Sequence, residues 1–214
     1  MKLPDLLTSI KNITSGSFIN VDKLIDRRIS ECDTLYYLSD EHDALVCFYF
    51  VATPILHING GPIKTLFLGL SASREEVKGS ALVVQLYEHA LKDKSGQMDS
   101  RGLLHCWSVA VNPSVYLAAR QYFDSVEPRL DGSYSSEGRS FAKAAREYLR
   151  FGLESGDGHP FLLKGIALSA PLNRDELYKM SKISGRRSMK ALLTLGFNIH
   201  NGDGLLFYGK IKIR

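Results

Sequence analysis

A short polar loop between an apolar stretch and an amphipathic helix holds the residues best suited to chemistry in this chain. Thr65–Leu91 predicts a buried strand, then the loop, then the helix. The first N–H groups of a helix have no backbone partner, and the helix dipole favours negative charge at that end. The loop therefore predicts an anion site with four candidate residues, Arg74, Lys78, Gly79 and Ser80. The alternative interpretation is that Lys78-Gly79-Ser80 only starts a helix.

Segments on the N-terminal side of this stretch predict helices and a hairpin. Apolar residues at helical spacing fill the first 32 residues, and the small residues 15–17 divide them into two helices. Thr34–Leu38 and Ala44–Ala52 are rich in Tyr, Phe and Val and are separated by a short polar link. That pattern is typical of an antiparallel hairpin.

Segments on the C-terminal side predict alternating strands and helices. A strand at Leu103–Val111 ends at Asn112-Pro113, and a helix is expected from about Ser114 to a point before Pro128. Because a hairpin comes first and crossovers follow, we expect one mixed α/β sheet flanked by helices. The remaining expected elements are helices at Arg139–Phe151, Asp175–Met180 and Ser188–Leu195 and strands at Phe161–Leu168 and Leu205–Ile213.

The composition suits a soluble core and excludes several kinds of site. The chain has 214 residues, 44% of them hydrophobic, and a formal charge of +4, which only weakly suggests a polyanionic partner. Its three cysteines form no C-x-x-C pair and its histidines no i, i+3 or i, i+4 pair, so neither a disulfide framework nor a metal site is expected. No segment resembles a membrane span or a secretion signal, so we expect a cytoplasmic protein.

The order of these elements, with the loop and the Asn-Pro pair, resembles the GNAT superfamily of acyl-CoA-dependent N-acyltransferases. In that family a loop of pattern Q/R-x-x-G-x-G/A holds the pyrophosphate of acyl-CoA with its backbone amides. Arg74 and Gly79 match the first and last positions, and Val77 stands where the pattern has its middle glycine. The resemblance covers roughly residues 33 to 213. It implies a GNAT-like fold with a mostly antiparallel sheet, and acetyl-CoA or another acyl-CoA as co-substrate.

The resemblance also implies roles for residues outside the loop. A strand that splays from its neighbour would bind the pantetheine amides through Gly69, Leu70 and Ser71, and backbone donors at Gly69 and Leu70 would stabilise the oxyanion. Asn112 would lie near the pantetheine arm. The family's catalytic tyrosine, which reprotonates the CoA thiolate, falls at Ala119 here. The candidate acids one turn away are Tyr116, which we select, and Tyr122.

The expected organisation is one GNAT-like domain over residues 1–214, with a helical N-terminal part at 1–32 and a helical insertion at 129–160. The expected reaction is acyl transfer to an amine, on a small molecule or a protein, by direct attack in a ternary complex. The alternative is a catalytically inactive GNAT-like module that binds a protein or nucleic acid, for which the basic segment Lys179–Lys190 is a candidate surface. Nucleic acid is the less favoured partner, because aromatic residues do not interleave with that segment. Residue types suited to the general base are Glu41, His42, Glu75 and His105.

Overall fold

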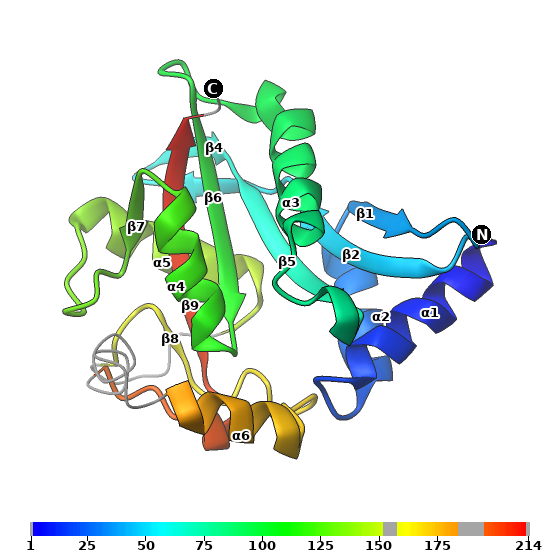
Figure 1. Cartoon of the computed structure of the whole chain (residues 1–214). Helices are drawn as coiled ribbons and strands as arrows, with labels where there is room; N and C mark the ends of the chain where they lie inside the picture. The colour runs from blue at the N-terminus through cyan, green and yellow to red at the C-terminus, as the bar shows by residue number, and fades with distance from the viewer. Residues whose placement is uncertain (1, 152–157, 184–194, 213–214) are drawn as a thin grey trace.

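The computed structural model describes residues 2–151, 158–183 and 195–212, in which helices pack on a twisted, mixed main sheet and two further strands form a small separate sheet (Figure 1). The helices are α1 (Leu3–Ser15), α2 (Val21–Glu31), α3 (Ala81–Asp93), α4 (Pro113–Tyr122), α5 (Ser136–Tyr148) and α6 (Arg174–Ile183). The 3-10 turns are η1 (Glu75–Val77), η2 (Lys94–Gln97) and η3 (Ile199–Asn201). The strands are β1 (Thr34–Ser39), β2 (Leu45–Ala52), β3 (Ile55–Ile58), β4 (Gly61–Lys64), β5 (Leu66–Ser73), β6 (Leu103–Ala110), β7 (Ser125–Glu127), β8 (Leu162–Leu163) and β9 (Gly204–Lys212).

The main sheet has the strand order β1-β2-β5-β6-β9-β7, with β8 paired to β9. Only β5 and β6 run parallel, and the other pairs are antiparallel. The parallel pair is joined by the crossover helix α3, as a parallel connection requires. The predicted fold class, a mixed and mostly antiparallel sheet flanked by helices, is therefore confirmed.

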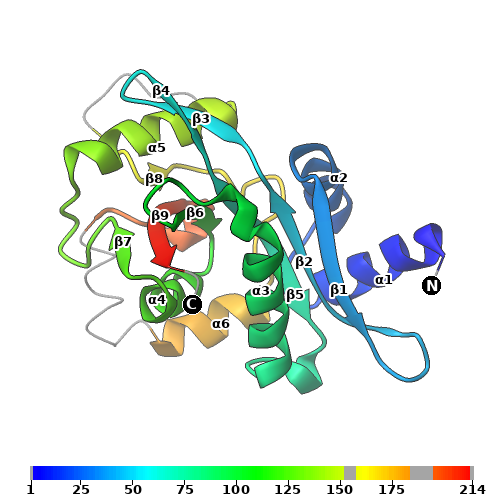
Figure 2. The ribbon, with the colours of Figure 1, turned by 90° about the horizontal axis from the view of Figure 1, so that it is seen from above.

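Helices cover both faces of the sheet because its strands bury side chains on both sides. Phe48 and Phe50 of β2 pack with Ile10 and Ile25 of α1 and α2. Alternate β2 residues belong to the core on the opposite face, where α3 contacts β1 and β2. Figure 2 shows α3 and the α1–α2 pair on opposite sides of these strands.

At the other end of the sheet, β9 directs neighbouring side chains to α4 and α5. Phe207 makes an edge contact with Tyr116 of α4 at 5.9 Å between ring centroids. Tyr208, the next residue, stacks on Phe141 of α5 at 3.9 Å. Helix α5 begins where the hydroxyl of Ser135 accepts a hydrogen bond from the Gly138 amide at 3.0 Å.

The structure corrects two expectations about strands. The helix expected from Ser114 to a point before Pro128 ends at Tyr122, because 125–127 pairs with β9 and becomes the edge strand β7. The strand expected at Phe161–Leu168 is reduced to Leu162–Leu163, and the residues after it form turns. The expected helix at Ser188–Leu195 and most of the basic segment after Lys182 lie outside the described residues.

Candidate active site

The site begins where β5 and β6 separate. They pair only at Leu66 with Cys106 and at Phe67 with Trp107. The Trp107 indole donates a hydrogen bond to the Thr65 hydroxyl at 3.0 Å, which holds this end closed. One residue farther, the Ser108 hydroxyl donates to the Leu68 carbonyl in place of a ladder bond. Beyond Ser108 the facing edges have no strand pairing, so backbone groups remain available for a ligand.

A β-bulge distorts β5 at the start of this opening. Tyr49 of β2 pairs with Ser71 and Val51 pairs with Leu68, so Gly69 and Leu70 together lie opposite one residue, Phe50. A Cβ atom on Gly69 would lie 2.8 Å from the Phe50 carbonyl oxygen. Such a contact is too close for any side chain, so the bulge requires glycine here.

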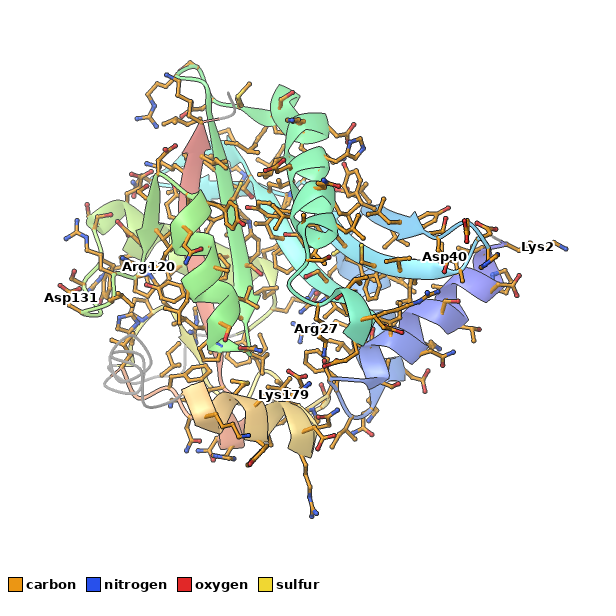
Figure 3. The ribbon with its side chains drawn as sticks, in the orientation of Figure 1. Lys2, Arg27, Asp40, Arg120, Asp131 and Lys179 are labelled. Atoms are coloured by element: carbon orange, nitrogen blue, oxygen red, sulfur yellow. The ribbon has the colours of Figure 1, made fainter. Side chains whose placement is uncertain are left out.

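The separated strands form the walls of a cavity of about 610 Å³, a volume typical of small-molecule sites. Helix α6 lies beneath the ends of β5 and β6 in Figure 1, and Figure 3 labels Arg27 and Lys179 around the same space. The lining comes from β5 (Gly69–Ser73), from β6 and its C-terminal end (Ser108–Asn112), from α2 (Lys23, Leu24, Arg27, Arg28), from the loop before α3 (Glu75, Lys78, Gly79) and from α6 (Glu176, Lys179, Met180), with Ser17, Phe18, Val83, Val115, Ile166, Ala167, Ser169, Ala170 and Leu172 completing it.

The polar loop reaches this cavity immediately before α3. Val77, which replaces the family's glycine, closes the turn η1 and is absent from the positive-φ residues, so its branched side chain fits there. Gly79 has the positive φ instead, at +73°. The Ser80 hydroxyl is buried and has no hydrogen-bond partner in the described part of the chain, and no side chain caps α3. The helix start therefore presents unused donors beside the cavity.

The described fold fits the resemblance drawn from the sequence. It combines a mostly antiparallel sheet, a parallel pair that splays, and a polar loop that opens a helix beside the splay. These are the features that the sequence resemblance implied for residues 33 to 213.

Comparison with known proteins gives only distant structural likenesses. No family model and no curated protein sequence matches the chain. Among solved structures, a mutant of the toxin AtaT bound to the C-terminus of the antitoxin AtaR and acetyl-CoA is 17% identical, with a TM-score of 0.30, over 36% of this chain and 48% of that one. The KacTA–DNA complex is 19% identical, with a TM-score of 0.35, over 45% and 63% of the two chains.

An N-myristoyltransferase of Saccharomyces cerevisiae with bound myristoyl-CoA is 10% identical, with a TM-score of 0.24, over 67% of this chain and 30% of that one. The present chain thus spans between 30% and 63% of the three solved chains named here. At these identities the likeness concerns the fold alone.

Most of the residues predicted to bind the cofactor meet at the cavity. Asn112 lies at the end of β6, and its side-chain oxygen also accepts a hydrogen bond from the Ser114 amide at 2.9 Å, which caps α4. The predicted residues on the cavity wall are Gly69, Leu70, Ser71, Lys78, Gly79 and Asn112.

Arg74 and Ser80 do not line the cavity. The Arg74 guanidinium donates to the Asp40 carboxylate at 2.9 Å, which ties it to the β1–β2 turn. Backbone donation from Ala44, together with Arg74, lowers the pKa of Asp40 from its ordinary value. Ser80 lies at the start of α3, next to the lining residue Gly79.

Tyr116 lies in the core rather than at the cavity wall. Its side chain is fully buried, and its hydroxyl donates to the Pro128 carbonyl at 2.5 Å. Burial raises the pKa of Tyr116 above its ordinary value. Tyr122 is 44% exposed and contacts Tyr87. The α4 residue that faces the cavity is Val115, so the structure does not bring either tyrosine to the site.

The base candidates are also scattered. Glu41 and His42 are exposed in the β1–β2 turn. His105 is buried between Asp99, at 3.1 Å, and the Tyr208 hydroxyl, at 2.8 Å, and does not line the cavity. Only Glu75 reaches the cavity wall.

Glu75 belongs to an ion network that joins the loop to α6. Lys78 contacts Glu75 at 2.6 Å and Glu176 at 3.2 Å. Lys179 contacts the same two carboxylates at 3.1 and 3.2 Å. Hydrogen bonding from Lys78 and Lys179 lowers the pKa of Glu75. Both lysines thus lie at the loop and are held by the same two acids.

Sequence reasoning missed the contributions of α2 and α6 to the site. Glu176 and the cationic residues of α2 line the same cavity as the loop. The spacing of Lys23 and Arg27, four residues apart, places them on one helix face and was a usable signal. Nothing local in the sequence brings that face to the splay.

Within the described residues, no helix combines the length and the apolar character needed to cross a bilayer.

Proposed function

We propose that this chain binds an acyl-CoA, with acetyl-CoA the expected one, and transfers the acyl group to an amine by direct attack in a ternary complex. The observation that carries the proposal is the splay of β5 from β6 beside a free helix start. The bulge at Gly69 leaves backbone groups unpaired, and the loop at Lys78-Gly79 reaches the same cavity. An acyl-CoA needs both features, one for the pantetheine and thioester and one for the pyrophosphate.

Each part of the co-substrate has a counterpart in the cavity. The N–H groups at the start of α3, with Lys78 and the unpaired Ser80 hydroxyl, would receive the pyrophosphate. The free edge of β5 at Gly69–Ser71 would bind the pantetheine amides, with Asn112 across the cleft. N–H groups at the bulge would stabilise the negative charge that develops on the carbonyl oxygen during attack.

Glu75→Gln is expected to tighten acetyl-CoA binding about two- to fivefold. The carboxylate is 68% exposed and lies 2.6 Å from Lys78, so it competes with a phosphate for that lysine. Removing this acid frees Lys78 and lowers the repulsion that an anion meets at the helix start. Calorimetric titration measures the change. Glu41→Gln, at an exposed acid of the β1–β2 turn that does not line the cavity, is the control. Equal or weaker binding in Glu75→Gln would count against the phosphate site.

Cys32 is expected to remain a thiol and to form no acyl-enzyme. Burial raises the pKa of Cys32 to about 12, and a thiol that keeps its proton is a poor nucleophile. Cys32 lies beside Gly69, where an acyl thioester would come close to it. Intact-mass measurement after incubation with acetyl-CoA and no acceptor should show the unmodified chain. A stable mass increase of one acetyl group that disappears in Cys32→Ser would contradict direct attack.

Turnover is tested by thiol release from acetyl-CoA with a panel of amines, and binding is tested separately by thermal unfolding. A ligand that binds only the native state stabilises it by roughly 2.7 kcal/mol at 100 times its Kd. An unchanged melting curve with acetyl-CoA and with longer acyl-CoAs would overturn the proposal.

A second reading is a GNAT-like binding module without catalysis. It is favoured by Ala119 at the family's tyrosine position, by the burial of Tyr116 and by the pairing of Arg74 with Asp40. Acyl-CoA binding without thiol release for any amine would support this reading.

A further inference from the structure

The face of α2 that lines the cavity is cationic, whereas the acids of this helix are not among the cavity's lining residues. Lys23 and Arg27 are four residues apart, and so are Leu24 and Arg28, so the four side chains form one face. All four line the cavity. The acids of α2 are Asp22, Asp26 and Glu31.

Arg28 is held near the point where β5 and β6 separate. Its side chain is 12% exposed and contacts Glu31 at 2.5 Å. Its guanidinium carbon lies 5.5 Å from the ring centre of Phe67, the last β5 residue paired with β6. Phe67 is two residues before the bulge at Gly69. The guanidinium therefore lies close to the expected position of the thioester.

The charge of Arg28 is incompletely neutralised. Its Nε atom is buried and has no hydrogen-bond partner among the described residues. Arg27 also binds Glu31, through Nε at 2.6 Å, so two guanidinium groups share one carboxylate. Burial lowers the pKa of Arg28 from its ordinary value, which reflects the lost solvation of the cation. A desolvated cation with a spare donor is stabilised by an anion that accepts from it.

The acids that line the described part of the cavity pair with other cations rather than with Arg28. Among the described lining residues the carboxylates are Glu75 and Glu176, and both contact Lys78 and Lys179 at the loop. The α2 side has no acid in the lining. The cavity thus has two sets of cations, the lysines that pair with Glu75 and Glu176 at the loop and the cationic face of α2.

We propose that the acceptor is an amine that also carries a carboxylate or a phosphate group, and that Arg28 and Arg27 bind this anion. The inference rests on the proposed function. With the anion on the α2 side, the amine faces the thioester at Gly69. Its nitrogen forms the new C–N bond, the C–S bond breaks, the amine gives one proton to water, and CoA leaves as a thiolate that water protonates. Planar guanidinium groups suit both anions through paired N–H donors.

The test uses amine pairs that differ in the anion. O-phosphoethanolamine is compared with ethanolamine, and L-phenylalanine with L-phenylalaninamide, by calorimetric titration into the chain saturated with CoA. CoA at saturation occupies the pyrophosphate site, so binding of a further anion measures the affinity of the α2 side of the cavity. At least one anionic member is expected to bind ten times more tightly than its uncharged partner, and the pair that shows this identifies phosphate or carboxylate. Equal binding, or no binding of any of the four compounds, would overturn the inference.

Substitutions test whether Arg28 and Arg27 cause the preference for anionic amines. Arg28→Gln is expected to weaken binding of the preferred anionic amine at least tenfold. Its affinity for acetyl-CoA should stay within twofold of the wild-type value. Arg28→Lys should lose less affinity than Arg28→Gln, because lysine keeps the positive charge but lacks the paired N–H donors of the guanidinium. Should Arg28→Gln not fold, Arg27→Gln, at a side chain that is 31% exposed, is expected to weaken anion binding two- to fivefold. Lys143→Gln, which removes an exposed cation of α5, serves as the control.

Two results separate this inference from the proposed function. A wild-type chain that binds acetyl-CoA but shows no preference for the anionic amines would overturn the anionic acceptor alone. Failure of the wild-type chain to bind acetyl-CoA would overturn both. A preference that persists unchanged in Arg28→Gln and Arg27→Gln would place the anion elsewhere and would also overturn the inference.

Discussion

Gly69→Val is expected to lower kcat/KM for acetyl-CoA by about 100-fold or more. The new Cβ would lie 2.8 Å from the Phe50 carbonyl oxygen and 3.1 Å from the Cys32 sulfur, so the bulge must shift. A shifted bulge moves the N–H groups that would stabilise the oxyanion, and loss of one such donor costs roughly 10²- to 10³-fold in rate. Thiol release at varied acetyl-CoA concentration measures the effect.

The matched control for this variant is Gly96→Ala. A Cβ on Gly96 meets nothing within 4 Å, and this residue does not have a positive φ. Its activity and melting temperature should equal those of the wild type. Wild-type kcat/KM in Gly69→Val would show that the bulge has no part in catalysis, and thermal unfolding confirms that the variant is folded when assayed.

Asp203→Ala is expected to destabilise the chain by roughly 1–3 kcal/mol, the usual cost of leaving hydrogen-bonding groups without their buried partner. Asp203 is 1% exposed. It accepts hydrogen bonds from the Lys164 ammonium at 2.8 Å, the Gly165 amide at 3.1 Å and the Asn198 amide at 2.9 Å. Its removal takes the acceptor from the two amides, whereas Lys164, which is 45% exposed, still donates to the Gly196 carbonyl. The melting temperature should fall by about 2–12 °C for a chain of this length.

Asp203 also supports the cavity. Ile166 and Ala167, which line it, directly follow Gly165, so we expect the acetyl-CoA KM of Asp203→Ala to rise at temperatures where the variant is folded. Asp203→Asn keeps the shape and should lose less stability. Asp131→Ala, at an exposed acid whose carboxylate caps its own turn through Ser133, should leave the melting temperature unchanged. Similar melting temperatures for Asp203→Ala and Asp131→Ala would refute this role.

Local patterns in the sequence were sufficient for most of the elements and for part of the site. The apolar run of β5, the small polar residues after it and the helical spacing of α3 are all contiguous, and they predicted a loop that the structure places beside the cavity. Val77 stands where the family pattern has a glycine, yet it fits a 3-10 turn, and Gly79 has the positive φ. Local conformational preferences decide such features.

Features that depend on distant pairing were not predictable in this way. The short strand β7 exists because Lys210, Gly209 and Tyr208 of β9 pair with it, and its three residues carry no strand pattern of their own. Arg74 fits the family pattern but is captured by Asp40, which lies 34 residues earlier. The position of Arg28 over Phe67 depends on how α2 packs on β5. Tertiary contacts therefore determined which residues share the cavity.

Hydrogen exchange with and without acetyl-CoA tests most directly whether the co-substrate occupies the splay. The account predicts slower exchange of the amides at Gly69–Ser71 and at Gly79–Val83 when acetyl-CoA is bound, with no change in the β3–β4 ribbon, none of whose residues line the cavity. Protection confined to other segments, or no protection at saturating acetyl-CoA, would contradict the proposal that this cleft holds an acyl-CoA.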